Sequence, residues 1–390
     1  MPKINTYKKS RRVPLLLFLF LISSHCCFSQ SERIDVGLLS GKKITRLLVA
    51  PVSDVYSVFA GDSLLTLIKR NDALSLTLIN DSVEVKTIAQ TFGTFKRVQI
   101  MALSKHASLK IKPADGKTET HLDNDLFINP GKNSLSVINH VDIDNYVAGV
   151  VEAESGYSAP DEYYKIQAIM CRTFAIESKG KHKADGYDLC DREHCQVFKG
   201  RNNRKPEIKL AVAATSGIVL VDSNNKPIFA AYHSNCGGQT DYSENVWKTE
   251  KSYLKPVVDT FCISSRNANW EKVISLHDWE KYLVKQNKEY IKPADSLYCF
   301  YQPERKSDYN LFGSSISLTQ VRKDFKLSST YFHIEQDADN IIFTGRGSGH
   351  GVGLCQQGAI EMARKGYSYK KILGYYYKGV RLVNYSQMKN

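Results

Sequence analysis

The sequence lacks several features that would assign it to common classes of protein. It holds no internal repeat and no low-complexity tract, which argues against a solenoid and against a long disordered segment. Beyond the first 29 residues, no apolar run is long enough to cross a bilayer. No basic patch is interleaved with aromatic residues, so we expect no nucleic acid partner. No glycine-rich stretch fits G-x-G-x-x-G, which disfavours a dinucleotide-binding loop.

The first 29 residues have the pattern of a signal peptide. Five basic residues precede a short apolar run at 13–22, and small residues just before Gln30 fit a cleavage site. A lipoprotein anchor at Cys26 or Cys27 is the less favoured alternative, because His25 is a poor match to the small residue that such an anchor needs. We therefore predict an exported protein, located in the periplasm, the cell envelope or the extracellular space.

The charge that remains after the leader is still basic. The leader holds five of the 53 Lys and Arg and none of the 40 Asp and Glu, so the net charge falls from +13 to +8. A basic exported protein meets anionic envelope polymers and lipid headgroups before it meets other partners. Roughly 360 residues remain, which is enough for one large core or two domains.

The patterns predict a mixed α+β fold whose first part is rich in β-strands. Residues 30–125 contain short alternating runs, such as 44–50 and 98–101, with turn pairs such as Asn80-Asp81 between them. Residues 126–390 are expected to form a catalytic domain with two key helices and a glycine-rich C-terminal motif. Within it, the charged stretch 262–335 is interpreted as an insertion, a subdomain or scaffold.

The stretch 142–178 predicts the two helices. Asp142 can cap a helix whose apolar stripe covers 143–151, and the next position on that stripe is Glu154. A second helix, expected to begin after a Ser158 cap, is apolar on nearly every side and should be buried. The sequence therefore suggests a buried helix beside which its neighbour presents a carboxylate to a partly dry site. A surface glutamate near a helix end is the alternative interpretation.

A short cysteine- and histidine-rich segment predicts a cross-link. Cys190, His194 and Cys195 lie within six residues, and His182 lies eight residues before Cys190. Two thiolates and one or two imidazoles are ligands that tetrahedral zinc prefers, and such a closed site would be structural. A disulfide between the two cysteines, or two inert thiols, are the alternatives.

Three further segments supply candidate polar contacts. His233 and Ser234 lie in a polar, glycine-rich segment that follows a strand-like run, and could bind a sugar. His350 and Gln356 flank the end of a run of alternating glycines, where the backbone can approach a ligand closely. Arg172 is a polar exception inside the second helix, and we expect it either to bind substrate or to pair with Glu154.

Another pair of cysteines is expected to be linked. Cys236 precedes two glycines, and the simplest interpretation pairs it with Cys262 in a disulfide, closing a loop of 26 residues. A cysteine nucleophile at Cys236 is the less favoured interpretation.

Five segments together resemble the stage II sporulation protein D family, which also contains the amidase enhancers called LytB. In this order along the chain they read Y-V-A-G-V-V-E-A-E, Q-A-I-M-C-R-T-F-A, H-C-Q-V-F-K-G, H-S-N-C-G-G-Q-T and G-R-G-S-G-H-G-V-G-L-C-Q-Q-G-A. The resemblance covers roughly 126–383. It departs from the family at Ser155-Gly156, where Met followed by Pro is common, and at Cys355, where Ser is common.

The resemblance implies a function for these residues. Enzymes of the family are lytic transglycosylases, which cleave the MurNAc–GlcNAc bond of peptidoglycan glycan strands and form 1,6-anhydroMurNAc. Their catalytic glutamate ends the motif that matches Glu154, and some hold zinc in the loop that here contains Cys190, His194 and Cys195, with His182 the fourth candidate ligand. The alternative is a non-catalytic peptidoglycan-binding enhancer of an N-acetylmuramoyl-L-alanine amidase.

Overall fold

Strands occupy the first third of the described chain, and helices begin only at Ile143, which confirms the expected α+β class. The computed structural model describes residues 1–2, 32–155, 158–201, 204–266, 268–287, 290–293 and 296–389. The leader at 3–29, including Cys26 and Cys27, therefore lies outside the described residues, as does Gly156. In the described segments, every helix is too short or too polar to span a bilayer.

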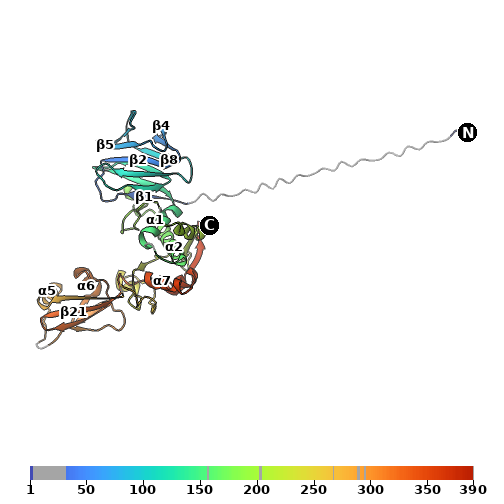
Figure 1. Cartoon of the computed structure of the whole chain (residues 1–390). Coiled ribbons are helices and arrows are strands. Elements are labelled where there is room, and N and C mark those ends of the chain that lie inside the picture. Colours follow the sequence, from blue (N-terminus) through green and yellow to red (C-terminus); the bar gives the residue numbers. More distant parts are fainter. Residues whose placement is uncertain are drawn as a thin grey trace. The chain divides into compact units, whose positions relative to one another are not determined.

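Two antiparallel sheets form the β-rich part (Figure 1). The first contains, in spatial order, β13 (Leu189–Cys190), β1 (Arg33–Leu38), β12 (Leu135–Asp142), β11 (Asp125–Pro130), β8 (Val98–Ala102), β3 (Tyr56–Ala60) and β4 (Ser63–Ile68), with β13 parallel to β1. The second contains β10 (Thr120–Asp123), β9 (Ser108–Pro113), β2 (Arg46–Ser53), β5 (Leu74–Ile79), β6 (Ser82–Lys86) and β7 (Thr91–Phe95).

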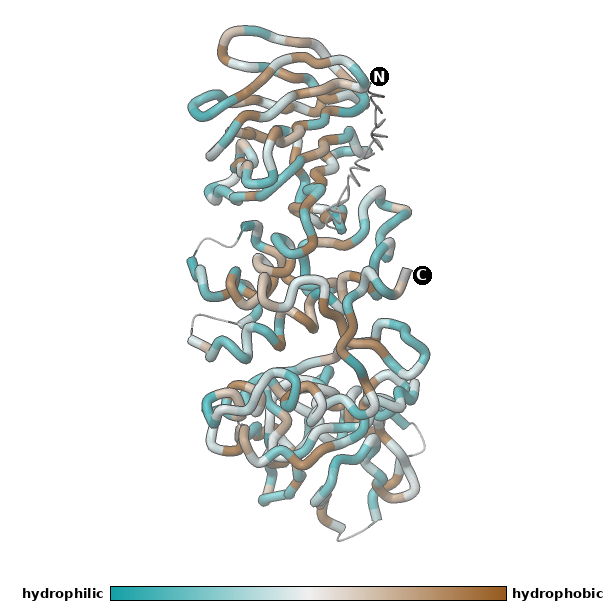
Figure 2. The backbone as a smooth tube through the Cα atoms, turned by 90° about the vertical axis from the view of Figure 1, so that its right-hand side faces the viewer, coloured by the Kyte–Doolittle hydropathy of each residue, from teal (hydrophilic) through white to brown (hydrophobic). Residues whose placement is uncertain are grey.

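Alternation of side chains explains this arrangement. Along β2, Leu47 and Val49 are fully buried while Arg46 and Leu48 are exposed, as expected for strands with one face on a core. Figure 2 shows hydrophobic and hydrophilic residues mixed along the backbone of this part. One hydrophobic core includes residues of both sheets and of the helices that follow. The first sheet also contains β11 and β12, so it continues past residue 125 and leads directly into the first helix.

The helices pack around one buried helix, α2. They are α1 (Ile143–Ser155), α2 (Asp161–Glu177), α3 (Pro206–Ala214), α7 (Gln356–Arg364) and α8 (Tyr369–Tyr376), and α2 contacts each of the others. The predicted cap of α1 is present, because Asp142 Oδ1 accepts hydrogen bonds from the backbone N–H groups of Asp144 and Asn145 at 2.8 and 3.4 Å. α2 begins two residues later than predicted, because Pro160 is extended, with ψ of 153°.

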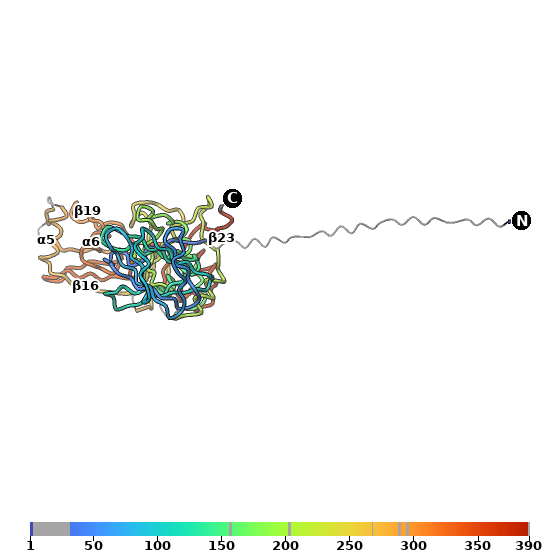
Figure 3. Tube along the Cα trace, turned by 90° about the horizontal axis from the view of Figure 1, so that it is seen from above, coloured from blue at the N-terminus to red at the C-terminus, as the bar shows by residue number. Residues whose placement is uncertain are grey.

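Residues 269–346 have a separate hydrophobic core, centred on the fully buried Trp279. Its four-stranded sheet has the order β16 (Asn269–Ser275), β21 (Asn340–Arg346), β20 (Phe332–Asp337) and β17 (Cys299–Phe300). A hairpin of β18 (Asp308–Leu311) and β19 (Ser314–Ser317) and the helices α5 (Leu276–Gln286) and α6 (Leu318–Asp324) complete it (Figure 3). This core overlaps most of the stretch interpreted above as an insertion or subdomain.

The remaining elements are short. They are η1 (Lys183–Asp185), β14 (Ile218–Val221), β15 (Tyr232–His233), α4 (Ser243–Trp247), β22 (Leu354–Cys355), β23 (Arg381–Asn384) and η2 (Tyr385–Lys389). β15 and β22 pair in parallel, and β14 pairs antiparallel with β23.

Candidate active site

Glu154 lies in the last turn of α1 and lines a cleft of about 440 Å³. The cleft also contains aromatic side chains from two segments, Phe174 of α2 and Phe229 and Tyr232 of the segment 229–232, together with His350. Charged side chains of Lys181 and Glu193 lie on another part of its wall. A half-buried carboxylate in a cleft with apolar and polar walls is the arrangement expected of a site that binds a small or extended ligand.

Two residues of α1 hold the segment 196–200 over the helix. Tyr146 is fully buried, donates a hydrogen bond to Gln196 Oε1 at 3.3 Å and contacts the Phe198 ring, with the ring centroids 5.1 Å apart. Gly149 provides the space for this approach, because a Cβ atom there would overlap the carbonyl oxygen of Gly200 and lie 2.6 Å from the Phe198 ring. The first and third of the five sequence motifs therefore pack directly against each other.

This packing places a backbone donor on the carboxylate of Glu154. The N–H of Val197 donates a hydrogen bond to Glu154 Oε1 at 3.3 Å. Burial raises the pKa of Glu154, and the nearby charge of Glu193 raises it further, whereas the Val197 hydrogen bond and Lys199 lower it. The net shift is upward, so a larger fraction of Glu154 is protonated near neutral pH than for an exposed glutamate.

Aromatic rings continue from the cleft towards its rim. The ring of Trp247 lies 5.0 Å from that of Phe229 and 5.0 Å from that of His350, measured between centroids. Trp247 is 38% exposed, which leaves part of its ring open to a ligand. Flat, partly exposed rings beside polar groups suit the apolar faces of a sugar ring.

The two histidines predicted to bind substrate lie together, with centroids 5.5 Å apart. His350 lines the cleft, accepts a hydrogen bond from the Val352 N–H at Nδ1, and has its pKa lowered by burial to about 4. His233 is almost fully buried, its Nδ1 lies 3.1 Å from the Val352 carbonyl oxygen, and burial holds its pKa well below its usual value. Both rings are therefore neutral near pH 7, and only His350 reaches the cleft directly.

Arg172 has a structural position instead of the predicted contact with substrate or with Glu154. Its side chain is fully buried, and its guanidinium donates two hydrogen bonds to Asp144 Oδ1, at 2.9 and 2.7 Å. It also donates to the backbone carbonyls of Ile218 and Val212. These contacts leave no exposed atom of Arg172 for a ligand. Arg172 is paired with Asp144 and not with Glu154, so it does not hold Glu154 in its ionised form.

Ser234 and Gln356 lie near the cleft but not on its lining. Ser234 follows β15, and its carbonyl oxygen accepts a hydrogen bond from the Gln357 N–H. Gln356 begins α7, where its side chain interacts with the buried Tyr163 hydroxyl. Both residues thus connect β15 and α7 with the helical core.

The four predicted metal ligands lie together beside the cleft. The ligand atoms of His182, Cys190, His194 and Cys195 are all within 4.8 Å of one another. His182 Nε2 lies 3.3 Å from His194 Nδ1, whose distances to the sulfur atoms of Cys190 and Cys195 are 4.0 and 3.9 Å. A set of two thiols and two imidazoles at these separations fits tetrahedral zinc.

The surroundings of this group also fit a metal site. His182 Nδ1 lies 2.9 Å from the carboxylate of Asp185, and a contact of this kind orients the ring of a histidine that binds a metal through its other nitrogen. The loop is anchored to the first sheet, where the Asp191 carboxylate accepts hydrogen bonds from the N–H groups of Leu39 and Ser40. The residues present could therefore hold a structural zinc ion.

Sequence reasoning did not find several residues of the site. Tyr232, Phe229 and Lys181 line the cleft, and the contact from Val197 is made by its backbone, which no side-chain pattern reveals. Trp247 lies outside the five sequence motifs. Its 38% exposure at the rim is the signal that only the structure supplies.

Comparison with known proteins gives consistent matches. Residues 131–221 match the family described as Stage II sporulation protein. An uncharacterised protein of Brachyspira hyodysenteriae is 30% identical over 268 residues, covering 66% of this chain and 71% of that protein. Stage II sporulation protein D of Bacillus subtilis is 28% identical over 295 residues, covering 72% and 85%. The Amidase enhancer of the same species is 26% identical over 346 residues, covering 71% and 47%. The chain has the five motifs in order and is similar in sequence to these relatives. It belongs to the stage II sporulation protein D family.

Proposed function

We propose that this protein is an exported lytic transglycosylase that cleaves the glycan strands of peptidoglycan. The single observation that carries the proposal is Glu154, a carboxyl group with a raised pKa in a cleft that has aromatic walls. Membership of the family and the name of its amidase-enhancer relative support a role at the cell wall. The net positive charge of the chain suits an anionic polymer of the envelope.

One carboxyl group suffices for this reaction. Protonated Glu154 donates its proton to the glycosidic oxygen as the bond to the MurNAc C1 breaks and the sugar becomes oxocarbenium-like. The Glu154 carboxylate then accepts the proton of the C6 hydroxyl, whose oxygen attacks C1 and closes the 1,6-anhydro ring. No water is consumed, so no second carboxylate is needed to activate one.

The surroundings of Glu154 suit both steps. Burial favours the protonated acid that begins the reaction, and the Val197 N–H stabilises the carboxylate that forms in the middle of it. The rings of Tyr232 and Phe229, with Trp247 at the rim, would hold the sugar rings, and neutral His350 can donate or accept a hydrogen bond.

A second function is favoured by one relative. The Bacillus subtilis protein named Amidase enhancer is similar to 71% of this chain, so a peptidoglycan-binding enhancer of a cell-wall amidase is the alternative. In that case the same aromatic cleft would bind glycan without cleaving it, and an amidase would be the protein partner.

The two functions are separated by purified sacculi and one substitution. The native protein alone should release 1,6-anhydro-muropeptides, and Glu154→Gln should reduce that release by at least about 10²-fold, the usual contribution of a general acid. Glutamine keeps the shape and the oxygen that accepts from Val197, so folding should be preserved. Glu152→Gln is the matched control, because Glu152 lies on the same helix, is oriented towards Arg204 and does not line the cleft. Products released only when an amidase is added would favour the enhancer.

We also propose that the group of His182, Cys190, His194 and Cys195 holds a structural zinc ion. With four protein ligands, the ion would have no free position for substrate and would fix the loop beside the cleft. Val197 follows Cys195 by two residues, so the stability of this loop sets where its N–H meets Glu154. Elemental analysis of Cys195→Ser should find one zinc ion fewer per chain than in the native protein.

A further inference from the structure

Three cysteines and an aspartate from distant parts of the chain meet in one buried cluster. Cys236 follows β15, Asp259 and Cys262 lie in the loop after Tyr253, and Cys355 caps the N-terminus of α7. All four side chains are fully buried, and their sulfur and carboxylate atoms lie within 4.8 Å of one another. Cys236 Sγ is 3.4 Å from Cys262 Sγ and 3.3 Å from Asp259 Oδ2.

The backbone around the cluster directs donors at the sulfur and oxygen atoms. Cys355 Sγ accepts hydrogen bonds from the N–H groups of Cys236 and Gly358, at 3.3 and 3.4 Å. The Tyr376 hydroxyl donates to Asp259 Oδ2 at 2.8 Å. A Cβ atom at Gly358 would overlap both the Asp259 carboxylate and the Tyr376 oxygen, so this close approach requires glycine. Such donors orient ligands and stabilise the negative charge on them.

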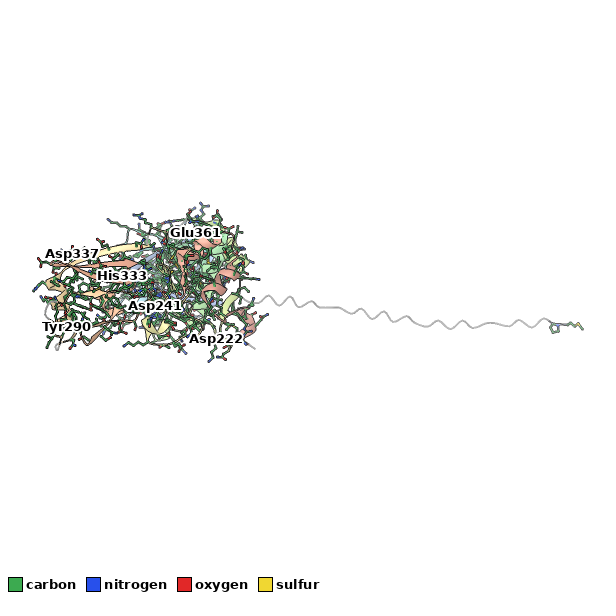
Figure 4. The ribbon with its side chains drawn as sticks, turned by 90° about the horizontal axis from the view of Figure 1, so that it is seen from below. Asp222, Asp241, Tyr290, His333, Asp337 and Glu361 are labelled. Atoms are coloured by element: carbon green, nitrogen blue, oxygen red, sulfur yellow. The ribbon has the colours of Figure 1, made fainter. Side chains whose placement is uncertain are left out.

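A cluster of this kind is suited to a cation. A fully buried carboxylate is unfavourable in its charged form unless it is hydrogen-bonded, is paired or coordinates a cation. The nearest described cation, Arg305, donates to the carbonyl of Cys236 at 2.6 Å, and its ion-pair partner is Asp241, 3.6 Å away and labelled in Figure 4. In the described part of the chain, no lysine or arginine forms an ion pair with Asp259.

We propose that Cys236, Asp259, Cys262 and Cys355 form a second, closed zinc site. Tetrahedral zinc with sulfur ligands at about 2.3 Å holds them roughly 3.8 Å apart, and the separations in this cluster, from 3.3 Å to at most 4.8 Å, bracket that value. A set dominated by thiolates selects zinc over magnesium and calcium. With four buried protein ligands the ion has no open position, so its role is structural.

The position of this site explains what it would stabilise. Cys355 ends β22 and Cys236 lies three residues after the end of β15, the strand that pairs with β22 and in which Tyr232 is opposite Leu354. Asp259 and Cys262 add the loop that packs against α8. The ion would thus join three chain segments behind the wall of the cleft that carries Tyr232 and His350. This inference does not depend on the reaction that the cleft performs.

The disulfide between Cys236 and Cys262 expected from the sequence is the competing state. It would use two of the four ligands and leave Cys355 and Asp259 without a cation. The two states differ in metal content and in thiol count, so one preparation of the native chain, purified from an oxidising compartment, distinguishes them.

The test measures zinc in the full chain and in three variants. The native protein should contain two zinc ions per chain, and Cys190→Ser/Cys195→Ser should retain one, because the proposed second site is untouched. Asp259→Asn/Cys355→Ser should lose one, and Cys299→Ser, a substitution at an exposed cysteine, should keep both. With Co²⁺ in place of zinc, the charge-transfer absorption of three thiolates should persist in the Cys190→Ser/Cys195→Ser variant.

Two results would overturn the proposal without any variant in the second site. The first is a native chain with a single zinc ion that is lost in Cys190→Ser/Cys195→Ser. The second is non-reducing peptide mapping that finds Cys236 linked to Cys262. If Asp259→Asn/Cys355→Ser does not fold, these measurements on the native chain still decide.

Discussion

Replacing Gly149 by alanine should destabilise the protein, although alanine is the better helix former. Gly149 is in the interior of α1, where the intrinsic preference for alanine over glycine is about 1 kcal/mol. Against this gain, the added methyl group would overlap the Gly200 carbonyl and lie 2.6 Å from the Phe198 ring. Overpacking of this kind typically lowers the free energy of unfolding by about 1–3 kcal/mol. Because the carbonyl belongs to the backbone and cannot rotate away, we expect a net loss of roughly 1–2 kcal/mol.

The same substitution at Gly374 provides the matched control. Gly374 lies in α8, is exposed, and has no atom within 4 Å of the position that a Cβ would occupy. Gly374→Ala should therefore stabilise the protein by about 0.5–1 kcal/mol. The two variants make the same chemical change in helices, with opposite expected signs.

Denaturant unfolding and release of anhydro-muropeptides should be measured on both variants. Gly149→Ala should unfold at lower denaturant and lose activity beyond its loss of stability, because displacement of 196–200 moves the Val197 N–H away from Glu154. Gly374→Ala should keep native activity. If Gly149→Ala were as stable as Gly374→Ala, the reasoning would be refuted, because the segment 196–200 could then move away from α1 at no cost in free energy.

The remaining predictions concern a buried ion pair, the carboxyl and the aromatic rim. Arg172→Met should lower the free energy of unfolding by about 3 kcal/mol, measured by denaturant titration, because it leaves Asp144 and buried carbonyls without their donor. Glu154→Gln should be as stable as the native protein below the unfolded-state pKa of about 4.3. The variant should then become the more stable of the two as pH rises through the raised pKa of Glu154, where the native protein must ionise a half-buried carboxyl. If the free energy of unfolding of Glu154→Gln fell relative to that of the native protein as pH rises, the raised pKa of Glu154 would be contradicted. Trp247→Ala should raise KM for glycan about two- to tenfold with kcat unchanged, while Tyr301→Ala, an exposed ring outside the cleft, should change neither.

The sequence predicted the parts of the site that depend on local pattern. The Asp142 cap, the apolar stripe of α1 and the position of Glu154 on it follow from a 3.6-residue period, and the structure has each of them. The burial of α2 follows from its apolar residues in the same way. Only its start was misplaced, because the predicted Ser158 cap lies before Pro160, whose extended conformation delays the first turn.

The parts that depend on long-range packing could not be predicted. Arg172 was expected at the substrate or at Glu154, and its actual partner, Asp144, lies 28 residues away in the first turn of α1. The periodicity of the two helices does not show which carboxylate of α1 lies next to Arg172 of α2. Likewise, Cys355 lies 119 residues from Cys236, so sequence spacing could pair Cys236 with Cys262 but could not add the third thiol.

The position of Glu154 follows from contacts at both ends of α1. At its start, Asp144 is held by Arg172, which is itself fixed by the carbonyls of Val212 and Ile218. The segment 196–200 closes over Gly149 in the middle of the helix, and its Val197 N–H binds Glu154 in the last turn. A helix held in this way resists a shift along its axis, so the carboxyl would keep its distance from the cleft walls through both proton transfers of the proposed reaction. Precise placement of this kind is what a single group needs if it acts first as an acid and then as a base. Substitution at Arg172 should therefore reduce kcat as well as stability, although Arg172 touches no substrate.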